Sequence, residues 1–187
     1  MKVIFLDHDG VICLYDNWGT RLKKQKEWGG RKLSMGLLEI PLEYRFDNFD
    51  QKAVKVLNEI LEKTGAEIVV LSDWKRWATV EEMGQYYESQ GIIKKPIAFT
   101  DSILYDDYEN FPWYRSLDLE QTRSLEISQY LGQNTHVTHW VSIDDLDMSL
   151  RGEDDKKWGL KNFVLTPMRL KGIKQSGVKE KILKFLK

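Results

Sequence analysis

Two carboxylates stand one residue apart near the start of the chain, directly after an apolar run. Residues 3–6 read Val-Ile-Phe-Leu and are followed by Asp7, His8, Asp9 and Gly10. Burying a charge is costly unless something pairs with it, and two like charges this close raise each other's pKa. We therefore expect either a cation that offsets the repulsion or a chemical use for the pair. The alternative is a strand that simply ends in an Asp-Gly turn.

Later apolar runs also end in polar residues. The run at 67–71 is followed by Ser72, and the run at 139–143 is followed by Asp144 and Asp145. The carboxyl ends of parallel strands meet at the edge where such sheets bind ligands. If the first strand lies between these two, the polar residues of all three strand ends lie together. Oxygen ligands at this density suit Mg²⁺, so the pattern predicts Mg²⁺-dependent chemistry on a phosphoryl group.

Five short runs, apolar throughout rather than alternating, predict strands buried on both faces, as in a parallel sheet. They lie at residues 2–7, 67–74, 95–101, 139–145 and 162–167. Amphipathic helices are predicted at residues 48–65, 79–91, 117–132 and 176–187. Asn48 is the expected N-cap of the first helix, and Gly65 is its expected end. The alternation predicts a single α/β domain over residues 1–187, with a doubly wound, mostly parallel, Rossmann-like sheet.

Residues 13–47, between the first strand and the first helix, are too many for a plain strand-to-helix loop. We expect an insertion there that covers the site as a flap or small cap. It contains Trp18 and Trp28 and is rich in basic residues, among them Arg21, Lys23, Lys24, Lys26, Arg31 and Lys32. Positive charge beside aromatic rings suits a polyanion or a stacked base. The same segment would equally close a pocket over a small phosphate ester.

The composition restricts the class of protein. The chain has 187 residues, of which 42% are hydrophobic and 30% are charged, and its net charge is −1. As a whole it does not attract nucleic acid or membranes, so any such attraction is local. No apolar run approaches the length of a membrane span, and the first strand leaves no room for a signal peptide. The single cysteine, Cys13, excludes an internal disulfide. We expect a cytoplasmic protein with no membrane partner, and the oligomeric state is left open.

Three motifs, in their order along the chain, resemble those of the haloacid dehalogenase (HAD) superfamily. They are DHDGV at 7–11, LSDW at 71–74 and IDD at 143–145. The resemblance implies an α/β phosphatase fold with Mg²⁺ as the cofactor. A carboxylate at position 9 favours phosphoryl transfer over dehalogenation, because only phosphoryl transfer needs an acid there.

The same resemblance implies a role for each motif residue. Asp7 would be the nucleophile that forms an aspartyl-phosphate. Asp9 would be the acid/base that protonates the leaving oxygen and then activates water. Ser72 would hydrogen-bond the transferring phosphoryl group. Mg²⁺ would be held by Asp7, the backbone carbonyl of Asp9 and Asp144, with Asp145 supporting them.

A cation that grips the phosphate is also expected, and three residues compete for this role. Arg123 is our choice, because the R-x-x-E-I pattern at 123–127 resembles a narrower HAD group linked to RNA-repair proteins. An exposed helix pair between Arg123 and Glu126 is the alternative. Lys75 and Arg115 are the rivals, and Lys75 stands where that group more often has arginine.

The sequence also predicts the positions of the three histidines, of the basic residues near the end of the chain and of a group of aromatic residues. On an extended strand His8 points away from its flanking carboxylates, so we expect it to pack rather than to react. His136 and His139 are expected at the surface, and the basic residues after Pro167 are expected on a solvated helix face. Aromatic residues within 105–114 are candidates for a wall of the substrate pocket.

Together these features predict a Mg²⁺-dependent phosphatase that hydrolyses a phosphomonoester through an aspartyl-phosphate. The substrate is either the phosphorylated end of an RNA or DNA, or a small ester such as a nucleotide or sugar phosphate. A nucleotide-sugar transferase with a metal-binding DxD motif does not explain Ser72 or the second acidic strand end. A non-catalytic binding module with this fold stays open, and a turnover assay separates it from an enzyme.

Overall fold

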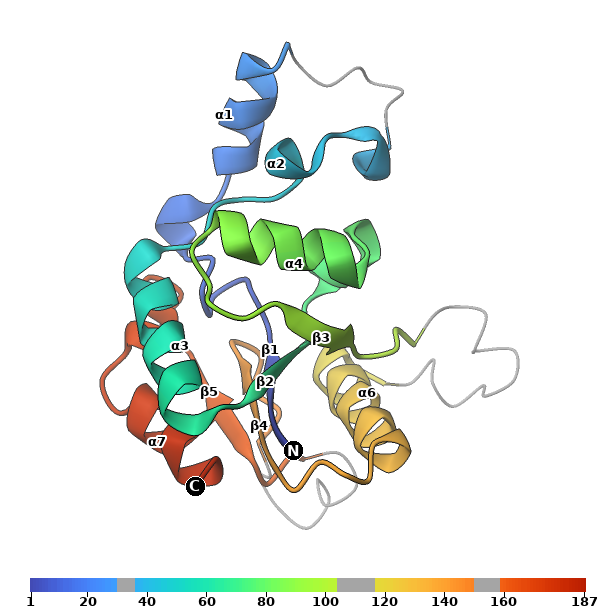
Figure 1. The fold of residues 1–187 in the computed structure, drawn as a ribbon, viewed down its shortest axis with the longest axis vertical. Helices are drawn as coiled ribbons and strands as arrows, with labels where there is room; N and C mark the ends of the chain where they lie inside the picture. Colours follow the sequence, from blue (N-terminus) through green and yellow to red (C-terminus); the bar gives the residue numbers. More distant parts are fainter. Residues whose placement is uncertain (30–35, 104–116, 150–158) are drawn as a thin grey trace.

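A five-stranded parallel sheet forms the centre of the molecule. The computed structural model describes residues 1–29, 36–103, 117–149 and 159–187 (Figure 1). The strands are β1 (Lys2–Leu6), β2 (Glu67–Val70), β3 (Pro96–Phe99), β4 (His139–Asp144) and β5 (Phe163–Leu165). Their order is β3-β2-β1-β4-β5, and every neighbouring pair is parallel. The predicted α/β fold is confirmed, and β1 lies between β2 and β4.

Helices cover both faces of the sheet. The longer ones are α3 (Gln51–Thr64), α4 (Val80–Ser89), α6 (Leu119–Gln133) and α7 (Val178–Phe185). On one face of β1, Ile4 and Leu6 pack in a large core with α3, α4 and α7. On the other face, Val3 and Phe5 pack in a smaller core with α6. Both faces of the strand are buried, which explains why its sequence is apolar throughout. Within the described ranges, no helix is both long and apolar enough to cross a membrane.

The beginning of α3 differs from the prediction. Asp50, not Asn48, caps this helix, because the Asp50 side chain accepts a hydrogen bond from Ala53 N at 2.8 Å. The Asn48 amide oxygen instead accepts a bond from Lys24 Nζ at 2.9 Å, which joins the insertion to the body of the domain. Gly65 ends the helix with a φ of 66°, as predicted.

The chain between β1 and α3 forms a small helical layer. Its elements are η1 (Tyr15–Asn17), α1 (Thr20–Glu27), η2 (Leu37–Glu39) and α2 (Leu42–Arg45). Figure 1 shows α1 and α2 beyond α4, at the end of the molecule opposite both termini. Asp47 fixes the start of α1, because its Oδ1 accepts bonds from Arg21 N at 2.7 Å and from Thr20 Oγ1 at 3.3 Å. Arg31 and Lys32 lie outside the described residues.

Candidate active site

Asp7 and Asp144 lie side by side at the carboxyl edge of the sheet. Asp7 directly follows β1, and its backbone N–H donates to the carbonyl of Ile143 on β4 at 3.1 Å. Asp144 is the last residue of β4, and its Oδ1 accepts a bond from Leu146 N at 2.8 Å. The two side chains are 2% and 0% exposed. The predicted meeting of these strand ends therefore produces two buried carboxylates in one place.

Arg123 lies between these carboxylates and carries the compensating charge. Its Nη1 is 2.6 Å from Asp144 Oδ2 and 3.3 Å from Asp7 Oδ1, and its Nη2 is 3.6 Å from Asp73 Oδ2. The guanidinium reaches this position from α6, and the residue is buried. The alternative of an exposed pair between Arg123 and Glu126 is wrong, because α6 packs on the sheet and both side chains face inward.

Lys75, one rival for the phosphate-binding cation, has a different buried partner. Its Nζ donates to Glu126 Oε2 at 2.5 Å and to Thr100 Oγ1 at 2.8 Å. Burial lowers the pKa of this ammonium group, while the charge of Glu126 opposes the shift. Lys75 thus joins the 3₁₀ helix η3 (Asp73–Trp77) to α6, the helix that carries the site arginine. The other rival, Arg115, lies outside the described residues.

Trp74 holds the side chain of Asp9. Its indole Nε1–H donates to Asp9 Oδ2 at 2.9 Å. The indole is stacked on Phe46 and Phe49, with ring centres 4.9 Å and 5.5 Å away, so the donor cannot easily turn aside. Burial raises the pKa of Asp9, and the bond from Trp74 acts in the opposite direction. The LSDW motif therefore supplies a direct partner for this carboxylate, a contact that the sequence analysis did not predict.

His8 packs on the opposite side of the chain from its two neighbouring carboxylates, as predicted. Its Nε2 is 2.7 Å from the Tyr87 hydroxyl, and its ring contacts those of Phe49 and Trp74. Burial, followed by the charge of Arg123, lowers its pKa to about 3. The imidazole is therefore neutral at physiological pH and belongs to the core.

Asp7, Asp144 and Asp145 each offer an oxygen atom, and these atoms lie within 4.8 Å of one another. Burial and then the charge of Asp144 raise the pKa of Asp7 well above its usual range. Asp7 Oδ1 accepts no hydrogen bond from the described residues, although Arg123 is near. Mutually repelling carboxylates with an unsatisfied buried oxygen fit a hard cation such as Mg²⁺. The carboxylate of Asp9 is not part of this group, since it faces Trp74.

Gly10 allows Asp145 to join this cluster. Its φ is +71°, a conformation that side-chain-bearing residues rarely adopt. A Cβ at this position would stand 2.5 Å from Asp145 Oδ2 and 2.7 Å from Asp145 Cβ. Position 10 therefore requires glycine both for its backbone and for the close approach of the carboxylate.

Ser72 is buried beneath the site and caps η3. Its Oγ accepts a bond from Trp74 N at 3.4 Å, which shapes the turn that presents Asp73 and Trp74. It is not among the residues that line the cavity described next. A direct bond from Ser72 to a phosphoryl group therefore stays a prediction.

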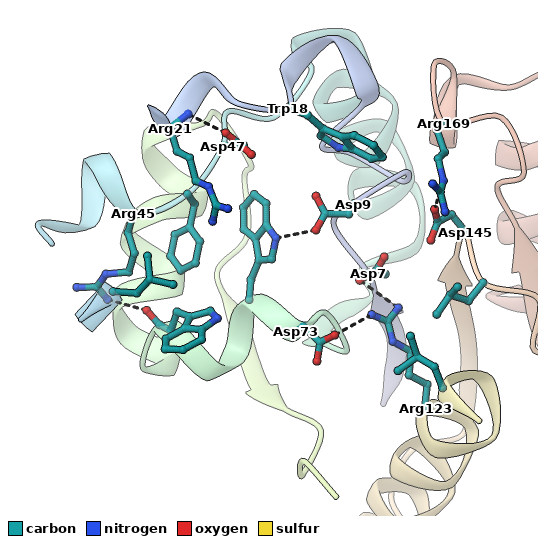
Figure 2. A pocket seen from close by; sticks show the side chains of 16 residues that line it. Asp7, Asp9, Trp18, Arg21, Arg45, Asp47, Asp73, Arg123, Asp145 and Arg169 are labelled. Carbon is teal, nitrogen blue, oxygen red and sulfur yellow. Dashed lines mark hydrogen bonds and ion pairs between the residues drawn. The ribbon is translucent and has the colours of Figure 1, made fainter. Parts of the chain in front are cut away.

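A cavity of about 460 Å³ opens above these residues (Figure 2). Its charged and aromatic walls are formed by Asp7, Asp9, Asp47, Asp73, Asp145, Arg21, Arg45, Arg123, Arg169, Trp18, Phe46, Trp74 and Trp77. Of the predicted site residues, Asp7, Asp9, Arg123 and Asp145 reach the cavity, and Asp144 supports them from below. The candidate aromatic wall at 105–114 lies outside the described residues.

Arg169 is a site residue that the sequence analysis missed. Arg169 is exposed, as expected for the basic residues after Pro167, but it lies in a turn rather than on a helix, and it lines the cavity. Its Nε donates to Asp145 Oδ2 at 2.9 Å, and its guanidinium lies 5.8 Å from the ring centre of Trp18. Because β5 ends at the same edge of the sheet as β1 and β4, the residues that follow it could have been predicted to lie near the site. His136 and His139 are exposed, as predicted.

The insertion contributes unequally to the site. Arg21, Lys23 and Lys26 are all exposed, but of these three only Arg21 lines the cavity. Lys24 is half-buried, with its Nζ bonded to Asn48 and lying 5.6 Å from the ring centre of Tyr86. Within the described residues, two cations of this segment, Arg21 and Arg45, therefore line the cavity, and Arg45 is buried and bonded to backbone carbonyls.

Comparison with known proteins identifies one family. The family model described as the HAD domain in Swiss Army Knife RNA repair proteins matches residues 3–176. That span runs from the second residue of β1 to beyond η6 (Gly172–Lys174), and it includes all of the described residues that line the cavity. Neither the curated proteins nor the solved structures include a significant match to the chain.

Proposed function

Because the chain belongs to the family of HAD domains found in Swiss Army Knife RNA repair proteins, we propose that it is a phosphatase that uses Asp7 as its nucleophile. HAD domains are generally phosphatases. The observation that carries the proposal is the position of Arg123 between Asp7 and Asp144, with Nη1 at 3.3 Å and 2.6 Å. A guanidinium at the nucleophile lowers the repulsion between this carboxylate and an incoming phosphate dianion.

In the first step, a carboxylate oxygen of Asp7 attacks the phosphorus atom of a phosphomonoester. An O–P bond to Asp7 forms while the bond to the leaving oxygen breaks, and Asp9 gives that oxygen its proton. In the second step Asp9 takes a proton from water, and the water oxygen attacks phosphorus. Inorganic phosphate leaves, and both Asp7 and Asp9 return to their starting states.

The environment of Asp9 supports the acid role. Burial raises its pKa, which favours a carboxyl group that carries a proton when the substrate arrives. The Trp74 indole occupies Oδ2, so Oδ1 is the atom that would hold the proton. In the proposed mechanism, Oδ1 is the Asp9 oxygen that faces the leaving group.

Asp7, Asp144 and Asp145 would hold Mg²⁺, together with the backbone carbonyl of Asp9 that the family resemblance implies. When bound, Mg²⁺ neutralises charge on the phosphoryl oxygens. Arg123 and, by the same resemblance, Ser72 would bind the remaining phosphoryl oxygens. These residues hold the phosphorus atom in line with the Asp7 oxygen and take no proton themselves.

We further propose a phosphorylated RNA or DNA end as the substrate. The description of the family supports this choice. So do Trp18 and Trp77, which line the cavity and keep 37% and 40% of their surfaces exposed, because partly exposed rings can stack on nucleobases. A small phosphomonoester is the competing substrate, and a cavity of about 460 Å³ is also of a size that admits one.

A panel of phosphate esters with Mg²⁺ tests this proposal. It includes 3′- and 5′-phosphorylated oligonucleotides, the matching mononucleotides, a sugar phosphate and an aryl phosphate. We expect the highest kcat/KM for one of the oligonucleotide ends. A higher kcat/KM for a small ester would show that the proposed substrate class is wrong and that the proposed reaction is right. No hydrolysis of any ester would indicate a binding module.

A further inference from the structure

Among the residues that the structure describes, four arginines line the cavity, and three of them already have partners in the protein. Arg123 is paired with the buried carboxylates, and Arg169 is paired with Asp145. Arg45 is buried and donates to the Ile40 carbonyl at 3.0 Å and to the Trp77 carbonyl at 2.8 Å. The guanidinium groups of these three residues therefore already contact acceptor groups of the protein.

Arg21 is different. Its backbone N–H donates to Asp47 Oδ1, but within the described parts of the chain its guanidinium has no hydrogen bond or ion pair. The backbone that carries the Arg21 side chain is nevertheless held in place by hydrogen bonds. Thr20, the preceding residue, donates to Asp47 and accepts a bond from Asn48 N at 2.8 Å. The result is a free positive group carried on a firmly held backbone.

The position of Arg21 separates it from the reacting atoms. Figure 2 shows Arg21 and Arg169 on opposite sides of Asp9, with Asp7 and Arg123 grouped together away from Arg21. The Arg21 side chain runs into the cavity, away from the carboxylate of Asp47. A group bound to Arg21 would thus belong to the same substrate molecule as the phosphoryl group at Asp7 without being the group that reacts.

We propose that Arg21 forms a second phosphate subsite, which binds a phosphate of the substrate other than the one hydrolysed. The proposal rests on the proposed phosphatase function. Arginine presents a planar fork of donors that matches phosphate oxygens, and an unpaired one has no protein contact to give up on binding. The second phosphate is either the neighbouring phosphodiester of a nucleic-acid strand or the second ester of a nucleoside bisphosphate.

Steady-state kinetics of Arg21→Gln test the subsite. Two substrates carry a second phosphate: a 3′-phosphorylated dinucleotide and a nucleoside 3′,5′-bisphosphate. Two carry none: a nucleoside 3′-monophosphate and an aryl phosphate. We expect the ratio of kcat/KM between the first class and the second to fall roughly 10- to 100-fold in Arg21→Gln, mainly through KM. Arg21→Lys should restore part of the ratio, because it keeps the charge but not the fork.

Lys23→Gln is the matched control, since it removes the same charge from the same helix at a residue that does not line the cavity. This variant should keep the ratio within about twofold of the wild type. A loss in Arg21→Gln for only the dinucleotide or only the bisphosphate supports the subsite and identifies its source. An equal loss for all four substrates, or an unchanged ratio, overturns the proposal.

Binding provides a readout that does not depend on turnover. Titration of the nucleoside 3′,5′-bisphosphate against intrinsic tryptophan fluorescence at 4 °C, with Asp7→Asn as the background, should show weaker binding when Arg21→Gln is added. Equal affinities with and without Arg21→Gln would overturn the subsite. If the wild-type protein hydrolysed none of the four substrates while this difference in binding persisted, the proposed reaction would fail and the subsite would stand.

Discussion

Replacing Trp74 with phenylalanine isolates the hydrogen bond that holds Asp9. The substitution removes the indole N–H, which donates to Asp9 Oδ2 at 2.9 Å. It keeps an aromatic ring on Phe46 and Phe49, whose rings stack on the indole. We therefore expect a folded variant in which Asp9 no longer accepts the hydrogen bond from the Trp74 indole nitrogen.

The size of the effect follows from the type of bond. A hydrogen bond to a charged group is worth about 1.5–3 kcal/mol. A loss of about 2 kcal/mol from the transition state of the first step corresponds to about a 30-fold decrease in kcat/KM. The loss should depend on the leaving group, because a nucleoside alkoxide needs a proton from Asp9 and a nitrophenolate does not. We expect about a 30-fold decrease for a nucleoside monophosphate and no more than a few-fold decrease for p-nitrophenyl phosphate.

The assay measures kcat/KM for both substrates at saturating Mg²⁺, because this parameter reports the step in which the leaving group departs. Thermal unfolding of each variant is the check on folding. Trp140→Phe is the control, because Trp140 packs on Phe5 in the core far from the cavity lining. This control should leave the ratio between the two substrates unchanged. Equal decreases for the two leaving groups in Trp74→Phe, or no decrease for the nucleotide, would refute the role of this bond in acid catalysis.

Three further predictions concern stability and metal. Lys75→Met leaves Glu126 buried without its charged partner and should lower the free energy of unfolding in urea by about 3–5 kcal/mol. Lys94→Met, which breaks a more exposed ion pair, should lower it by less than about 1 kcal/mol. Equal losses in the two variants would contradict the argument from burial. Chelation should abolish turnover, and Mg²⁺ but not Ca²⁺ should restore it, because Ca²⁺ takes more ligands at longer distances; full activity after exhaustive chelation would count against this. Gly10→Ala should raise the Mg²⁺ concentration for half-maximal activity about tenfold or more, because the alanine Cβ would displace Asp145. An unchanged Mg²⁺ titration would show that Asp145 is not needed for metal binding.

The fold was predictable because burial on both faces leaves a direct trace in the sequence. Runs such as residues 3–6 are apolar at every position, and the structure explains this by the two cores on either side of β1. The parallel order then brings the carboxyl ends of β1 and β4 together. Asp7 and Asp144 therefore meet for a reason that the strand pattern contains.

Contacts between side chains from distant segments were not predictable in the same way. The bond between Trp74 and Asp9 joins residues 65 positions apart, and the Lys75–Glu126 pair joins residues 51 apart. Neither follows from helical or strand periodicity, since each depends on how η3 packs. Arg169 was missed because the end of the fifth predicted strand was not considered, although β5 ends at the same edge.

The insertion illustrates what charge counting leaves out. Its basic residues look equivalent in the sequence, but they have different environments in the structure. Lys24 packs on Tyr86, and Lys23 and Lys26 are exposed away from the cavity. Arg21 and Arg45 line the cavity, but Arg45 is buried and bonded to backbone carbonyls. Side-chain direction on α1 depends on the packing of α1 against Asp47 and Asn48, which composition does not encode.

The most direct test of the nucleophile compares wild type and Asp7→Asn in hydrolysis of the best ester of the panel. The amide keeps the shape of the side chain and removes the anion that attacks phosphorus. Arg123 keeps its 2.6 Å contact with Asp144 in this variant, so thermal unfolding should show an intact fold. We predict that turnover falls by about 10⁴-fold or more, as when other covalent nucleophiles are removed. Hydrolysis by folded Asp7→Asn at a rate near that of the wild type would contradict the assignment of Asp7 as the nucleophile.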